Sequence, residues 1–301
     1  MPRTETTTIP FDAADMSDRP VADQHRTFVA GSEIGATVAP GAVPGEPLLV
    51  SGYIDERRAT MAKPFREWTV LPHGKLERVQ DNVLSVTGFL NMPPMGRVTR
   101  RMTVVRLADG RLVIYSAIAL DEEQMAALED FGRPAFLVVP GPIHRMDAKI
   151  WKDRYPRLLV VTPAGARDRV QEVVPVDATE VDFADPTVRF ISVPGTGDQE
   201  AALMIEAEGG TTLILNDLIF DLDNRPGFTG WLFKTVGMTG DKPHIPPPVR
   251  MREVKDKPVL AAQFESWARL ASLKRVIISH GDIITKDPRA VLGRIAEELR
   301  T

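Results

Sequence analysis

Thr212-Leu-Ile-Leu-Asn-Asp217 and Val276-Ile-Ile-Ser-His280-Gly281 are two apolar runs that lead into a side chain able to bind a metal or move a proton. Short runs without polar alternation are typical of strands covered on both faces, as in α/β proteins. In such folds, the polar residues that follow a strand lie in the loops that carry chemistry. Asp217 and His280 are therefore the first candidates for a functional site.

The residues before Asp217 contain several strand patterns separated by turn signals. Asp109-Gly110 is the strongest of these signals, because this dipeptide favours the tight turn of a β-hairpin. Asp121 and Gln124 have the spacing of a helix N-cap and its partner, and Gly132 is typical of a helix end. We expect strands at 82–90, 102–107, 111–118, 135–139 and 158–161 in the first half, and at 188–193, 201–207 and 211–216 in the second.

The segment from Asp221 to Pro258 shows no regular pattern and is too long for a plain connection. Its aromatic residues predict a substrate-facing loop or lid. The three that we assign to it are Phe228, Trp231 and Phe233. Beyond this segment, we expect one helix over 259–273 and another that starts with Asp287 as N-cap and Pro288 at its first position.

The order of these elements predicts the fold class. Each half of the chain has a β meander followed by alternating strands and helices, which indicates two mixed β-sheets packed together with helices outside. We therefore expect an α/β protein with an αββα four-layer sandwich over residues 61–301. Residues 1–60 are rich in Thr, Ala, Pro and Gly, and we expect them to form a disordered or loosely attached arm.

Composition excludes several classes of protein. Charged residues make up 26% of the 301 residues and the formal net charge is −4, so a nucleic-acid partner is not expected. The chain has no cysteine, which excludes disulfides and thiolate metal sites. It shows no signal-peptide pattern and no apolar stretch of the ~18 residues that a membrane span requires. We expect a soluble, cytoplasmic protein whose partner is a small-molecule substrate, and its oligomeric state is left open.

Two motifs resemble a known family. Leu215-Asn-Asp217-Leu-Ile-Phe220 looks like the Gly-Asp-Leu-Leu-Phe strand end of the metallo-β-lactamase superfamily, and Val276-Ile-Ile-Ser-His280-Gly281 resembles its final Gly-His-Gly motif. The resemblance covers roughly residues 68–285 in the order of elements. It is greatest to a divergent branch with degenerate metal-binding motifs.

The resemblance implies a reduced metal site. In the family, a His-x-His-x-Asp-His loop supplies most ligands of a two-metal centre, whereas Pro140-Gly-Pro-Ile-His144-Arg-Met-Asp147 keeps only one histidine, which resembles the last of that motif. Thr196 stands where the family has its next histidine. The ligands that remain are His144, Asp217 and His280, which implies a mononuclear Zn, Fe or Mn centre or no metal at all.

Two further carboxylates lie near these ligands in the sequence. Asp147, three residues after His144, is a candidate extra ligand, and Asp282, two residues after His280, is a candidate to orient that imidazole and assist catalysis. A simpler interpretation also stands, since an Asp at a strand end often forms a turn and a His or Asp before a helix often caps it.

Two functions follow from these residues. The first is a metal-dependent hydrolase or lyase-like enzyme that acts on a small organic substrate, with Asp217, His280 and Asp282 at the catalytic centre. The second is a non-catalytic, metal-free protein of the same fold that serves in binding or interaction.

Overall fold

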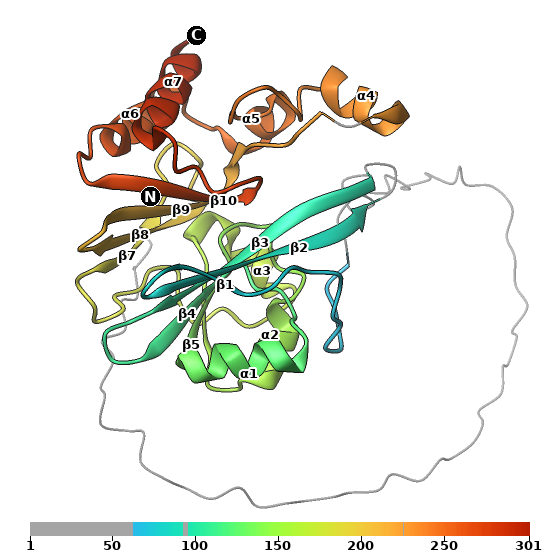
Figure 1. The fold of residues 1–301 in the computed structure, drawn as a ribbon, viewed down its shortest axis with the longest axis vertical. Coiled ribbons are helices and arrows are strands. Elements are labelled where there is room, and N and C mark those ends of the chain that lie inside the picture. Colours follow the sequence, from blue (N-terminus) through green and yellow to red (C-terminus); the bar gives the residue numbers. More distant parts are fainter. Residues whose placement is uncertain (1–62, 93–95, 225) are drawn as a thin grey trace, which may run out of the picture. The chain divides into compact units, whose positions relative to one another are not determined.

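The computed structural model describes residues 63–92, 96–224 and 226–301 and arranges them in two mixed β-sheets with helices outside (Figure 1). The arm expected at residues 1–60 lies outside the described residues. The strands are β1 (Glu77–Gln80), β2 (Val83–Met92), β3 (Gly96–Arg106), β4 (Arg111–Tyr115), β5 (Arg133–Val138), β6 (Leu159–Val161), β7 (Val188–Ser192), β8 (Ala201–Ala207), β9 (Gly210–Phe220) and β10 (Leu273–His280). The helices are α1 (Glu122–Phe131), α2 (Ala148–Arg154), α3 (Arg167–Gln171), α4 (Gly227–Thr235), α5 (Pro247–Glu253), α6 (Lys257–Ala268) and α7 (Pro288–Arg300).

The first sheet has the strand order β1-β2-β3-β4-β5-β6. Strands β1 to β4 pair antiparallel, and β5 and β6 are added parallel to β4. The Asp109-Gly110 turn joins β3 to β4, and Gly110 adopts φ +82°, which glycine reaches without strain. Helix α1 then connects β4 to β5, and Asp121 caps it by accepting a hydrogen bond from the backbone N–H of Gln124 at 2.9 Å.

The second sheet has the order β10-β9-β8-β7, with β7, β8 and β9 antiparallel and β10 parallel to β9. The β9–β10 pairing is regular up to Ile278 opposite Leu215 and resumes with His280 opposite Phe220. One residue of β10 therefore lies opposite four residues of β9, and these four residues form a large bulge. Asp217 lies inside this bulge, so the strand does not end at the aspartate as we predicted but continues to Phe220.

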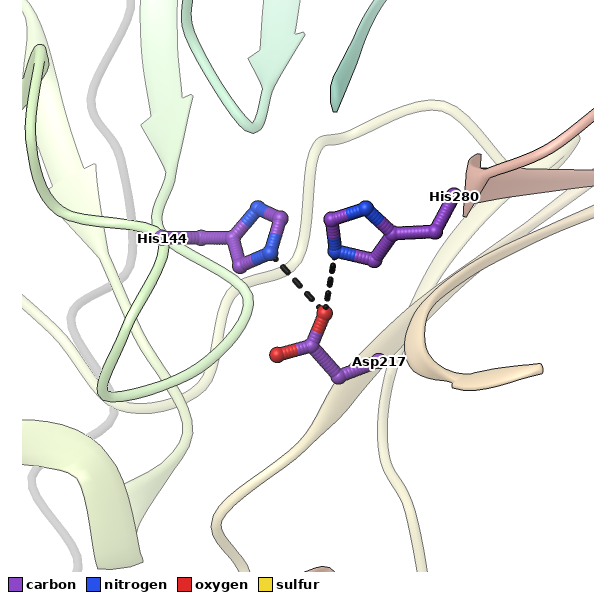
Figure 2. Close-up of side chains that lie close together, drawn as sticks. All are labelled: His144, Asp217 and His280. Atoms are coloured by element: carbon purple, nitrogen blue, oxygen red, sulfur yellow. Dashed lines mark hydrogen bonds and ion pairs between the residues drawn. The ribbon is translucent and has the colours of Figure 1, made fainter. Parts of the chain in front are cut away.

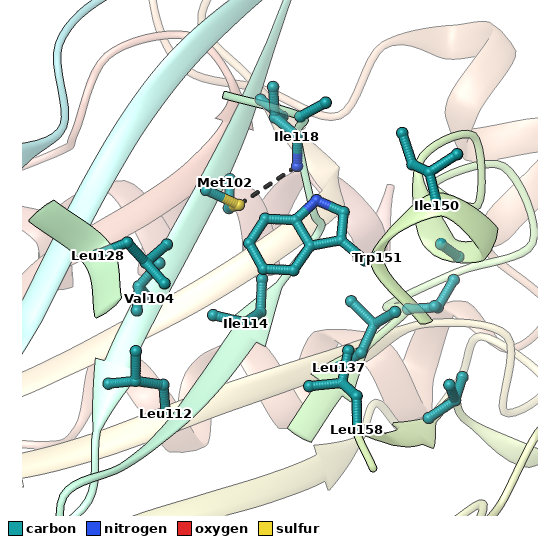
Figure 3. Close-up of a cluster of buried hydrophobic side chains, with 14 of the residues drawn as sticks. Met102, Val104, Leu112, Ile114, Ile118, Leu128, Leu137, Ile150, Trp151 and Leu158 are labelled. Atoms are coloured by element: carbon teal, nitrogen blue, oxygen red, sulfur yellow. Dashed lines mark hydrogen bonds between the residues drawn. The ribbon is translucent and has the colours of Figure 1, made fainter. Parts of the chain in front are cut away.

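Three clusters of buried apolar side chains define the layers. One cluster lies between the sheets and includes Val105 and Val113 from the first and Leu203 and Ile277 from the second. Another packs α1 and α2 against the outer face of the first sheet, around the fully buried Trp151 (Figure 3). A third packs α5, α6 and α7 against the outer face of the second sheet. The αββα sandwich predicted from the sequence is confirmed.

The C-terminal third differs in detail from the sequence prediction. The segment 221–258 is not irregular, because it contains α4, α5 and the start of α6. The helix expected at 259–273 runs from Lys257 to Ala268, since Asp256 caps its start and Leu273 already belongs to β10. Helix α7 begins at Pro288 after Asp287 as predicted, although Asp287 makes no capping hydrogen bond through its side chain. Every helix among the described residues is too short or too polar to span a lipid bilayer.

Candidate metal centre

Three side chains that are far apart in the sequence meet at one end of the two sheets. His144 lies in the loop that follows β5, Asp217 lies in the bulge of β9, and His280 is the last residue of β10. Their side chains are only 10%, 5% and 12% exposed. The structure therefore places together, at low exposure, the three residues that the sequence assigned to a metal.

One carboxylate oxygen is the centre of this arrangement. Asp217 Oδ1 lies 2.9 Å from His144 Nε2 and 3.0 Å from His280 Nε2, and Figure 2 shows both imidazoles turned toward it. The three ligand atoms all lie within 4.8 Å of one another. Ligands bound at about 2.1 Å to one ion lie about 3.0 Å apart when they occupy adjacent octahedral positions, so the spacing fits a shared ion.

The hydrogen bonds of His280 indicate which kind of group its Nε2 and the Asp217 carboxylate can share. His280 Nδ1 is 2.6 Å from the carbonyl oxygen of Thr99, and a carbonyl only accepts, so Nδ1 carries the proton. In the neutral ring, Nε2 then presents a lone pair to the Asp217 carboxylate at 3.0 Å. Two acceptors this close require a proton or a cation between them, and this donor set therefore fits a divalent ion.

His144 is oriented by a hydroxyl group. Its Nδ1 lies 2.8 Å from Ser116 Oγ, which leaves Nε2 directed at Asp217. Ser116 follows β4 and adopts φ 56°, a left-handed conformation that costs energy for a residue with a side chain. Its backbone N–H donates to Val138 at 3.0 Å, and the strained turn therefore sets the hydroxyl beside the histidine loop.

Asp217 is held as a carboxylate. Burial opposes its ionisation, but the neighbouring His144 and His280 outweigh burial and hold the pKa of Asp217 well below its usual range. Its second oxygen, Oδ2, lies 3.5 Å from Nη2 of Arg252. The carboxylate thus presents one oxygen to the imidazoles and the other to a guanidinium.

A buried glutamate supports the bulge from behind. Glu200, which is 1% exposed, accepts hydrogen bonds from Asn216 Nδ2 at 3.2 Å and from the backbone N–H of Asp217 at 3.4 Å. Burial, and then the charges of Asp217 and Glu253, raise the pKa of Glu200 well above its usual value. Gly141 leaves the room for this carboxyl, because a Cβ there would lie 2.5 Å from Glu200 Oε1.

Asp147 does not join the ligands. Its carboxylate accepts from the backbone N–H of Ala119 at 3.0 Å and forms a buried ion pair with Arg100. Both oxygens are therefore used beneath the start of α2, and the extra ligand that we considered is not supported by the geometry.

Asp282 does not orient His280. The position expected for its carboxylate, at His280 Nδ1, is taken by the carbonyl oxygen of Thr99, and the Asp282 side chain is exposed. The chain turns away immediately after His280, because Gly281 adopts φ +139° and a Cβ there would lie 2.5 Å from the Asp221 carbonyl oxygen. A backbone group therefore has the orienting role that we assigned to this carboxylate, and an assisting role of Asp282 in catalysis stays a prediction.

Thr196, at the position of the missing histidine, is fully buried and bonds within its own turn. Its hydroxyl donates to the carbonyl oxygen of Val193 at 2.7 Å and accepts from the backbone N–H of Glu200 at 3.4 Å. It therefore supports the segment that carries Glu200 and offers no imidazole to an ion.

The aromatic residues assigned to a substrate loop lie on helix α4. Phe233 is 5% exposed and packs inward, whereas Trp231 is 60% exposed. The side chain of Phe228 lies outside the described residues. That these residues face a substrate stays a prediction.

Sequence reasoning missed the groups that position the ligands. Ser116, Thr99, Glu200 and Arg252 carry no motif, and they reach the site only through strand pairing and helix packing. Phe220 was quoted as part of a motif but not as a neighbour of His280, whose ring it stacks on at 4.6 Å between centroids. A signal was present only for Glu200, a charged residue directly before the apolar strand β8.

Comparison with known proteins shows similarity in structure only. No family model matches the sequence, and no curated protein matches it. Among solved structures, FIM-1 from Pseudomonas aeruginosa in its mono-zinc form superposes with a TM-score of 0.51 at 13% identity, covering 76% of this chain and 96% of that one. DIM-1 exposed to ceftazidime gives 0.53 at 15% identity, over 76% and 99%. A metallo-β-lactamase from Erythrobacter litoralis gives 0.52 at 12% identity, over 76% and 100%.

Sequence identities this low support a shared architecture and give no information about the substrate. Two mixed sheets between helices, with a His-Asp-His group at one end, agree with that architecture. The resemblance inferred from the two motifs is confirmed at the level of the fold. The chain has the metallo-β-lactamase fold.

Proposed function

We propose that this protein is a metal-dependent enzyme of the hydrolase or lyase type, with a single divalent ion held by His144, Asp217 and His280. The observation that carries the proposal is the convergence of both imidazole Nε2 atoms on Asp217 Oδ1, at 2.9 and 3.0 Å. Two imidazoles and one carboxylate suit Zn, Fe or Mn and leave coordination positions for water and substrate.

A divalent ion held by these three residues would act as a Lewis acid, which would polarise a carbonyl or phosphoryl oxygen and make water a nucleophile at neutral pH. The protein's own groups hold the ligands in place. Thr99 fixes the tautomer of His280, Ser116 orients His144, and Glu200 supports the backbone of Asp217. Such support is what keeps a reduced ligand set at one geometry.

Metal analysis tests the proposal. Protein purified without chelators and then reconstituted with Zn, Fe or Mn should retain a single ion per chain after dialysis. Asp217→Asn should weaken retention by more than about 100-fold, because the loss of groups outside the ligand set already costs about 10–100-fold. Asp223→Asn, a change at an exposed carboxylate nearby, serves as the matched control. Wild-type protein that keeps no ion under any of these conditions contradicts the proposal.

A metal-free binding protein is the second candidate, and the Arg252 contact favours it. A guanidinium 3.5 Å from Asp217 Oδ2 balances the charge of the carboxylate without an ion. In that case Asp217→Asn would change the thermal unfolding temperature equally in the presence and absence of divalent metal. A metal-dependent difference favours the enzyme.

Activity would then be sought with simple esters, thioesters, lactones and phosphodiesters, comparing reconstituted and chelator-treated protein. Turnover that is lost on metal removal, restored by one metal and absent in Asp217→Asn would assign the reaction class.

A further inference from the structure

Arg252 is placed between the metal centre and solvent. It lies in the last turn of α5, and about half of its side chain is exposed, at 49%. Its Nη2 is 3.5 Å from Asp217 Oδ2, and its Nε donates to Glu253 Oε1. The guanidinium therefore bridges two carboxylates, one of which is the central ligand of the proposed metal centre.

These two carboxylates belong to a larger buried acidic group. Glu253 is fully buried, and within the described residues its Oε2 has no hydrogen-bond partner. Glu200 lies behind Asp217 and is 1% exposed. We call Asp217, Glu200 and Glu253 the carboxyl cluster.

Buried carboxyl groups at this density require positive charge or protons nearby. His144 and His280 face only Oδ1 of Asp217, so they leave Oδ2 and both glutamates without a cation from that side. Arg252 faces Oδ2 and Glu253 directly. Burial lowers the pKa of Arg252, but the negative charges of Asp217, Glu253 and Glu200 outweigh burial and raise this pKa above its usual value. The guanidinium is a permanent cation in the electrostatic field of all three carboxyls.

We propose that the guanidinium of Arg252 takes the place of a second metal ion beside the carboxyl cluster and so limits the centre to a single divalent ion. This inference rests on the proposed function. Asp217 can give one oxygen to each of two ions only if both oxygens are free, and Arg252 places its positive charge at the oxygen that the imidazoles do not face. Arg252 acts as a positioning residue, because it acts through Asp217 and sets the number of ions.

The test is metal stoichiometry in the full chain. Arg252→Met keeps a side chain of similar length and removes the charge. After equilibrium dialysis against Zn or Mn, elemental analysis should find a single ion in the wild type and a second ion in Arg252→Met. Arg252→Lys should keep a single ion, because it restores the positive charge. Arg250→Met is the matched control, since it removes the same charge two residues earlier on α5, where side chains point to a different face.

A second variant set checks the role of the carboxylates. Glu200→Gln and Glu253→Gln, added to Arg252→Met, should abolish the second ion and leave the first. If Arg252→Met unfolds without metal, Arg252→Gln, which removes the charge but keeps hydrogen-bonding capacity, should fold and show the same gain. Thermal unfolding with and without Mn gives an independent readout, since the extra ion should raise the melting temperature of the charge-removed variants more than that of the wild type.

The outcomes separate the two proposals. A folded Arg252→Met or Arg252→Gln that still binds a single ion overturns the inference and leaves the proposed function standing. A wild type that binds no ion overturns the proposed function, and with it the premise of the inference. A wild type that already binds a second ion overturns the inference and the single-ion part of the proposed function, and leaves the metal-dependent activity standing.

Discussion

Each imidazole of the candidate metal centre has one ring nitrogen beside a supporting group and the other beside Asp217. For His280 the support is the carbonyl oxygen of Thr99, and for His144 it is the hydroxyl of Ser116. The sequence predicted the two histidines and the aspartate because each follows an apolar run or a recognisable motif. It misplaced Asp147 and Asp282, because proximity along the chain does not fix which group fills the space beside a ring nitrogen.

Ser116→Ala tests the support of His144. The variant removes the hydroxyl that lies 2.8 Å from Nδ1 and keeps the strained backbone turn, so His144 loses orientation and the affinity for a divalent ion should fall about 10–100-fold. Titration of the apoprotein with Zn, followed by calorimetry, measures the change. Ser192→Ala, at a half-buried position on β7 where the hydroxyl contacts Asp198, should bind as tightly as the wild type. Unchanged affinity in Ser116→Ala would show that the hydroxyl does not position the ring.

At the scale of elements, regular strands were easier to predict than the bulge and the short helix that place residues in the candidate site. The range 201–207 was predicted as observed for β8, because its apolar residues and the following Gly209-Gly210 turn are local signals. The bulge of β9 was not, because it depends on the pairing of His280 with Phe220 across two strands. Helix α5 was read as irregular although Pro247 at its first position is a favourable start, since the three consecutive prolines obscured the short helix behind them.

Asp185 ties the β3–β4 connection to the segment before β7. Its carboxylate accepts from the backbone N–H of Ala108 at 2.8 Å and from the N–H and hydroxyl of Thr187 at 2.9 and 2.6 Å. Burial opposes ionisation, but these hydrogen bonds and the charge of Arg111 lower the pKa of Asp185. The pKa of Asp185 is therefore lower in the folded protein than the value of about 3.9 in the unfolded chain. The ionised carboxylate stabilises the fold at pH values above about 3.9, and this stabilisation is lost as the pH falls through the pKa of the folded state.

Asp185→Asn should therefore cost about 1–3 kcal/mol at neutral pH, because an amide nitrogen cannot accept the Ala108 hydrogen bond. The difference in unfolding free energy from the wild type should shrink as the pH falls below about 4. Urea unfolding over a pH series measures this difference. Asp241→Asn, at an exposed position, should show no such trend. A difference that stays constant with pH would contradict the assignment.

At the scale of the whole molecule, the layer order was predictable because the meanders and apolar runs alternate in the sequence. How the two sheets are joined was not. Arg101 of β3, in the first sheet, donates from Nε to Ile278 at 3.0 Å and from Nη2 to Gly281 at 2.7 Å, so it binds the strand that ends in His280. A buried arginine in an apolar strand carries no sequence signal for its partner.

Arg101→Met should lower the free energy of unfolding by about 3 kcal/mol, because two carbonyl oxygens near the sheet interface lose charged donors while the apolar volume is kept. It should also weaken metal binding, since His280 lies between these two carbonyls. Denaturant unfolding and Zn titration measure the two effects. The exposed Arg66→Met provides the comparison. Loss of stability with normal metal affinity would show that the two sheets are joined independently of the site.

The spacing of the ligands along the chain has a consequence for how the protein matures. His144 and Asp217 are 73 residues apart, and Asp217 and His280 are a further 63 apart. Contacts of such long range form late, after the loops between them have closed. A metal ion bound by all three residues would therefore not start the folding of this chain, and a scaffold that has already assembled would acquire it. During synthesis the nascent chain would have no complete three-residue site until β10 is made, so the ion that it binds would depend on the metals that the folded protein meets.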